Sequence, residues 1–120
     1  MSWEVLKTEK FEEWWATLTD DQQDAVIASV DILADQGPTL GRPLVDRITG
    51  SRHHNMKELR VSKGGALRIL FAFDPLRRAV LLLGGDKYGN WTGWYQEAIP
   101  VADDLFDAYL QDLRREGLIP

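Results

Sequence analysis

Three strand-like runs between residues 56 and 85 constrain the fold more than any other feature of this sequence. They read MKELRVS, ALRILFAFD and AVLLLGG, and their apolar positions recur with the period of two that strands require. Residues 63–65 and 74–78 separate the runs and are rich in glycine, proline and charge, as tight turns are. The pattern predicts an antiparallel meander whose third strand, apolar on both faces, is central.

Helical patterns flank this meander. The segment TEKFEEWWATL and the segment that follows it each form an apolar stripe, and Thr19 with Gln22 has the form of a capping box. Gly37 and Pro38 should end the second helix, and VADDLFDAYLQDLRREG, after Pro100, should form a last one. SWEVLK predicts a short opening strand, whereas residues 39–55 are typical of a loop.

The predicted order is therefore β-α-α-β-β-β-α. This is an α+β fold, in which helices cover one face of an antiparallel sheet and a C-terminal helix closes the domain. Residues 1–120 hold neither a linker nor an internal repeat, so we expect one domain.

Strand alternation assigns the charged residues of the meander to one face. Leu59, Val61 and the apolar positions of the second run should point toward the helices. Glu58, Arg60 and Arg68 then lie on the opposite face, which we expect to be open.

The net charge of −5 conceals an asymmetry along the chain. Residues 42–95 carry ten Lys or Arg against four Asp or Glu, so the middle is basic and the ends are acidic. Charged residues often do no more than solvate a face. A basic section in a small acidic protein is also what a phosphate-binding surface requires.

Several classes of protein do not fit the composition. The sequence has no apolar stretch long enough to span a membrane and no signal-peptide pattern, which predicts a cytoplasmic protein without a membrane partner. It has no cysteine and only two histidines, which are adjacent, so we expect no metal and no other cofactor.

The segments MKELRVSKGGALRILFAFD, LLLGGDK and IPVADDLFDAYL resemble the RelE/HigB superfamily of type II toxins, and most closely its HigB-like, phage-derived branch. The resemblance covers nearly the whole chain. It implies a small endoribonuclease that cuts mRNA, usually on the ribosome. It also implies inhibition by a cognate antitoxin, expected to be a helix-turn-helix protein encoded nearby. Related ParE toxins act on DNA gyrase, so a gyrase inhibitor or a non-catalytic interaction module on the same fold is the alternative.

Metal-free RNA cleavage needs cations for the phosphate oxygens, a base and an acid. Arg60 and Arg68 suit the first role, because a guanidinium matches phosphate geometry, although each could instead pair with Glu58. The resemblance at GGDK assigns Lys87 a phosphate contact, where the other interpretation is a solvated loop lysine. Tyr95 is the candidate for proton exchange, and these four residues form the predicted catalytic set.

Aromatic residues near cations can stack unpaired bases. We expect Trp91 and Trp94, in a segment too rich in glycine for a helix, to bind RNA together with Lys57 and Tyr88. The alternative is that at least one of the two tryptophans covers the core beneath the last helix. His53 and His54 are interpreted as a solvated loop pair, with catalysis as the second possibility.

Overall fold

The computed structural model describes residues 2–61, 66–86 and 91–120. It confirms the α+β class and adds one strand to the predicted order. The elements in chain order are β1 (Glu4–Lys7), α1 (Glu9–Trp15), α2 (Asp20–Gln36), the 3-10 turn η1 (Gly37–Thr39), β2 (Val45–Arg47), β3 (Lys57–Val61), β4 (Leu67–Phe73), β5 (Arg78–Asp86) and α3 (Trp91–Arg115).

The strands form one five-stranded sheet in the order β1-β5-β4-β3-β2. The predicted meander β3-β4-β5 is antiparallel, and β1 adds to it in parallel beside β5. β5 is therefore an interior strand, as its apolar faces require, but β4 occupies the middle of the sheet.

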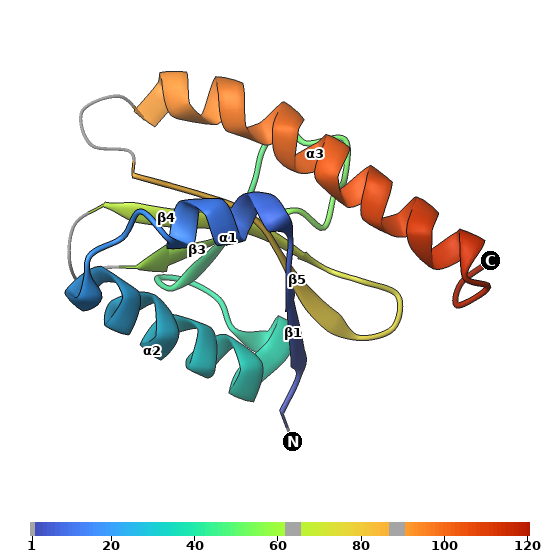
Figure 1. Cartoon of the computed structure of the whole chain (residues 1–120), viewed down its shortest axis with the longest axis horizontal. Helices are drawn as coiled ribbons and strands as arrows, with labels where there is room; N and C mark the ends of the chain where they lie inside the picture. The colour runs from blue at the N-terminus through green and yellow to red at the C-terminus, as the bar shows by residue number, and fades with distance from the viewer. Residues whose placement is uncertain (1, 62–65, 87–90) are drawn as a thin grey trace.

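Helices cover both faces of the sheet. On one face α1 and α2 pack on side chains such as Leu59, Ile69 and Phe71. On the other face α3 packs on a second cluster that includes Met56 and Leu82. Figure 1 shows α2 and α3 on opposite sides of the sheet. The face that carries Glu58, Arg60 and Arg68 is thus partly covered by α3, and the expectation of an open face was wrong.

The apolar stripes and end residues in the sequence predicted the first two helices correctly. The predicted capping box is present: the Gln22 amide donates to the Thr19 hydroxyl (3.2 Å) and the Thr19 amide donates to the Gln22 side chain (2.9 Å). Gly37 ends α2 with a φ of 61°, a conformation that favours glycine.

Two boundaries differ from the prediction. The expected loop at 39–55 contains β2, which pairs with β3 at the sheet edge. The last helix begins at Trp91 and continues through Gly93 and Pro100, so the segment that we judged too rich in glycine is helical. Glycine and proline cost a helix about 1 and 3 kcal/mol. Burial of residues such as Ala98 against the sheet offsets that cost.

Candidate functional site

Two arginines face each other across the sheet. Arg60 of β3 and Arg68 of β4 are directly paired in the antiparallel register. Glu58 lies two residues before Arg60 on the same strand and therefore on the same face. The predicted assignment of all three side chains to one face is correct.

Glu58 is the centre of this group. The residue is 4% exposed, and its carboxylate lies 3.3 Å from Nε of Arg68 and 3.6 Å from Nη2 of Arg60. Arg60 also contacts Asp46 of β2, at 3.2 Å between Nη2 and Oδ2. The ion pairing that we weighed as the structural alternative for the arginines is therefore present.

Tyr95 brings α3 into the same group. Its hydroxyl donates a 2.5 Å hydrogen bond to Oε1 of Glu58. Burial and this hydrogen bond raise the pKa of Tyr95 to about 12, although the nearby Arg68 opposes the shift. The phenol therefore keeps its proton at neutral pH and is a hydrogen-bond donor. We call Glu58, Arg60, Arg68 and Tyr95 the arginine cluster.

The paired glycines at the end of β5 make room for tryptophans on both faces of the sheet. A Cβ on Gly84 would lie 2.2 Å from the indole of Trp14, and a Cβ on Gly85 would lie 2.1 Å from Nε1 of Trp94. Because successive strand residues point to opposite faces, each glycine accepts one indole. Trp94 thus covers the core beneath α3, as the structural alternative predicted.

The remaining predicted residues do not all join the cluster. Lys57 lies on the opposite face of β3, where its ammonium is 5.6 Å from the ring centroid of Phe73. Burial and the charge of Arg47 lower the pKa of Lys57. Trp91 is the first residue of α3. Lys87 and Tyr88 lie outside the described residues.

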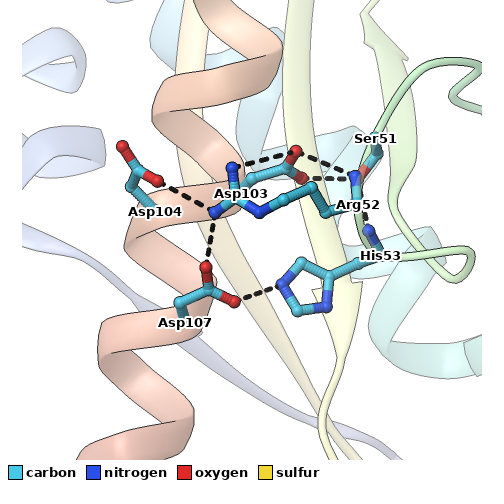
Figure 2. A network of polar contacts seen from close by, with 6 residues as sticks. All are labelled: Ser51, Arg52, His53, Asp103, Asp104 and Asp107. Atoms are coloured by element: carbon cyan, nitrogen blue, oxygen red, sulfur yellow. Dashed lines mark hydrogen bonds and ion pairs between the residues drawn. The ribbon is translucent and has the colours of Figure 1, made fainter.

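A second polar network ties the loop before β3 to α3 (Figure 2). Both the Ser51 hydroxyl (2.5 Å) and the Arg52 amide (2.9 Å) donate to the buried Asp103 carboxylate. The Arg52 guanidinium and Nε2 of His53 contact Asp107, at 2.5 and 2.7 Å. The hydrogen bond from Arg52 lowers the pKa of Asp107, and His53 lowers it further.

Sequence reasoning missed this network, and the interpretation of His53 as solvated was wrong. His53 packs edge-on against Phe106 with ring centroids 4.9 Å apart, while His54 is exposed. The only available signal was a group of three acidic residues in the last predicted helix, Asp103, Asp104 and Asp107, of which Asp107 lies one turn after the other two. This pattern alone does not identify a partner.

Within residues 2–61, 66–86 and 91–120, no group of three or more His, Cys, Asp or Glu side chains could hold a metal ion. The helices of the same residues include none that is long and apolar enough to cross a membrane.

Comparisons with known proteins show the family of the chain and relatives of its fold. Residues 13–107 match the family model described as phage derived protein Gp49-like. The chain is 50% identical over 106 residues to HigB3 of Mycobacterium tuberculosis, which is named as a toxin, with 88% of this chain and 92% of HigB3 covered. It is 47% identical over 104 residues to HigB2 of that organism, likewise named as a toxin. That match covers 85% of this chain and spans about half (52%) of HigB2.

Two solved structures share the fold. A mutant of the Escherichia coli toxin RelE in the free state superimposes with a TM-score of 0.62 at 11% identity, covering 83% of this chain and 97% of RelE. The isolated RelE toxin gives a TM-score of 0.59 at 11% identity, with 82% and 97% covered. At this identity the likeness concerns the fold alone.

Proposed function

The chain belongs to the phage-derived Gp49-like family, within the RelE/HigB toxin superfamily, and on that premise we propose that it is a type II toxin that cleaves mRNA. We place its action on the ribosome, in the cytoplasm. The observation that carries the proposal is the direct pairing of Arg60 with Arg68, beside a protonated tyrosine.

The cluster suits the electrostatics of phosphoryl transfer. Charge develops on the phosphate oxygens in the transition state, and two guanidiniums on adjacent strands can stabilise it together. Arg60 remains accessible for this purpose, because 30% of its side chain is exposed. An arginine can hold a carboxylate with one edge and a phosphate with another.

We assign the reaction to internal attack by the RNA. The 2′-hydroxyl gives up its proton to solvent water and its oxygen bonds to the adjacent phosphorus, while the bond from phosphorus to the 5′ oxygen breaks. The products are a 2′,3′-cyclic phosphate and a 5′-hydroxyl. Tyr95 is assigned the proton transfer to the departing oxygen, because a phenol with a pKa of about 12 is protonated at neutral pH. Its single hydroxyl proton is donated to Glu58 in the free protein, so in this proposal the Tyr95 hydroxyl turns from Glu58 to the departing oxygen when RNA binds.

Residues near the cluster in sequence complete the proposed site. Lys87 directly follows Asp86, the last residue of β5, and we assign it a phosphate contact. Tyr88 and Trp91 are assigned to base stacking. Trp94 and Lys57 receive no RNA contact in this proposal, because Trp94 packs on Gly85 and Lys57 occupies the other face of the sheet.

A partner that silences the toxin should reach the same face. We propose a cognate antitoxin whose acidic or amphipathic segment covers Arg60, Arg68 and Lys87 or displaces α3, since charge complementarity speeds capture. A complex that leaves all three residues open to solvent would contradict this.

One observation favours a second function. Both arginines of the cluster already have carboxylate partners, Glu58 and Asp46, so the face is close to neutral without a ligand. A protein-binding module, including a ParE-like gyrase inhibitor, would need no further charge compensation there.

Induction in cells separates these functions. An endoribonuclease should produce new mRNA 5′ ends within minutes of induction, with no change in plasmid supercoiling. A gyrase inhibitor should relax plasmids without creating such ends. Growth arrest with neither signature would overturn both assignments.

A further inference from the structure

Two arginines placed directly opposite each other on a sheet need a reason to be stable there. Like charges at paired positions of adjacent strands repel each other and destabilise the pair. Arg68 is also poorly hydrated, because only 15% of its side chain is exposed. A negative group between the two guanidiniums is required to hold them in this arrangement.

Glu58 meets this requirement. Its carboxylate reaches both arginines, with Oε1 toward Arg68 (3.3 Å) and Oε2 toward Arg60 (3.6 Å). A carboxylate with 6% side-chain exposure is itself stable only when it is paired and hydrogen-bonded. The arginines and the carboxylate therefore depend on one another.

Glu58 also fixes the start of α3 over the arginines. The hydrogen bond from Tyr95 joins Oε1 to the helix, one residue after Trp94, which packs on Gly85. Asp46 cannot substitute for Glu58. Among the described residues its carboxylate contacts the side chains of Arg60 and Arg42 and the backbone amide of Arg47, and neither Arg68 nor Tyr95.

We propose that Glu58 is the positioning residue of the site, holding Arg60 and Arg68 in register and Tyr95 above them. This rests on the proposed ribonuclease function. Glu58 itself does not touch RNA, since its carboxylate is enclosed by the three side chains that it positions. It acts through them.

Glu58→Gln tests the proposal, because glutamine keeps the shape and removes the charge. The matched control is Asp46→Asn, which also removes a carboxylate from Arg60 but leaves Arg68 and Tyr95 in place. Cleavage of a 5′-labelled mRNA on purified ribosomes gives kcat and KM for each protein. Misplacing reacting groups by about 1 Å can cost on the order of 100-fold in rate.

We expect kcat to fall about 100-fold in Glu58→Gln with KM within about threefold of the parent, and both constants of Asp46→Asn to stay within about threefold. Parental kcat in Glu58→Gln would overturn the proposal. If Glu58→Gln does not fold, Glu58→Asp keeps the charge on a shorter side chain. A parental kcat in Glu58→Asp would overturn the proposal, and a kcat below that of the parent would support it.

A second readout does not require activity. With tyrosine labelled at 13Cζ, and Tyr95→Phe identifying the signal, the parental Tyr95 resonance should not titrate between pH 7 and about 10, because its pKa is about 12. In Glu58→Gln the pKa of Tyr95 should fall below the parental value, because the negative charge of Glu58 is lost while the burial of the phenol remains. An unchanged titration would show that Glu58 does not hold Tyr95. If the parent cleaves no mRNA, the proposed function fails, and this titration alone decides the positioning role.

Discussion

The indole of Trp94 lies so close over Gly85 that a Cβ on residue 85 would come within 2.1 Å of the indole Nε1. Gly84 has the same relationship with Trp14 on the other face of the sheet. The two glycines of β5 are therefore packing residues, and they join α1 and α3 to one strand.

Gly85→Ala should destabilise the protein. The added methyl group must displace Trp94 or the strand, and overpacking of this kind costs about 1–3 kcal/mol. Gly41→Ala is the matched control, because no atom lies within 4 Å of a Cβ at Gly41. Urea unfolding of the two variants measures the difference in the free energy of unfolding. Equal free energies of unfolding for the two variants would show that Trp94 moves aside without a loss of stability.

Arg68→Ala should abolish growth inhibition. The variant loses one of the two guanidiniums assigned to the phosphate, while Glu58 keeps Arg60 and Tyr95 as partners. Some loss of stability is expected, because a buried carboxylate loses a cation. Arg42→Ala, an exposed arginine, is the control and should remain toxic.

Far-UV circular dichroism and thermal melting decide whether the Arg68→Ala result concerns function. If Arg68→Ala does not fold, Arg68→Lys retains the charge but not the planar fork, and should be folded and strongly impaired. A folded and fully toxic Arg68→Ala would remove Arg68 from the site.

An RNA with a single 2′-deoxy nucleotide at the cut site should resist cleavage. The substitution removes the attacking oxygen, whereas a hydrolase that activates water would still cut the bond. The upstream product of the unmodified RNA should carry a 2′,3′-cyclic phosphate, detectable by mass spectrometry. Cleavage of a minimal RNA should also survive EDTA. A cut at the deoxy position would end the assignment.

Asp107→Asn should make the protein less stable at neutral pH and less sensitive to acid. The pKa of Asp107 is lowered in the folded protein, chiefly by Arg52, so its contribution is present above the unfolded pKa of about 4. That contribution is lost as the pH falls through the lowered folded pKa. At pH 7 the urea midpoint of the parent should therefore be higher than that of the variant. The two midpoints should converge as the pH falls below 4.

The control for this comparison is Asp112→Asn, on the exposed side of the same helix, where the carboxyl contacts only Arg115 among the described residues. A difference between parent and Asp107→Asn that stays constant from pH 7 to below pH 4 would contradict the linkage. It would show that the variant acts on stability through shape and not through charge.

Much of the fold was predictable because its signals are local. Period-two alternation identified β3 and β4, and it put Glu58, Arg60 and Arg68 on one face because side chains of a strand alternate by geometry. The N-terminal ends of α1 and α2 were predictable for the same reason, because each cap is a hydrogen bond between residues three positions apart.

The candidate site was only partly predictable. Arg60, Arg68 and Tyr95 are indeed together, but Glu58, which joins them, was considered only as a neutralising partner. Lys57 was expected beside the arginines and lies on the other face, as the same alternation rule requires of an odd-numbered position in β3. The positions of Lys87 and Tyr88 remain predictions.

The sequence by itself determined strands β1, β3, β4 and β5, the first two helices and the faces that the residues of β3 and β4 occupy, because these follow from backbone geometry and neighbouring side chains. Only the tertiary structure decided that α3 begins at Trp91, despite Gly93 and Pro100, and that it covers the arginine face. It also decided that Arg52 meets Asp103 and Asp107, more than fifty residues away. These features arise from burying a helix against a sheet, and the free energy of that burial comes from partners distant in the chain.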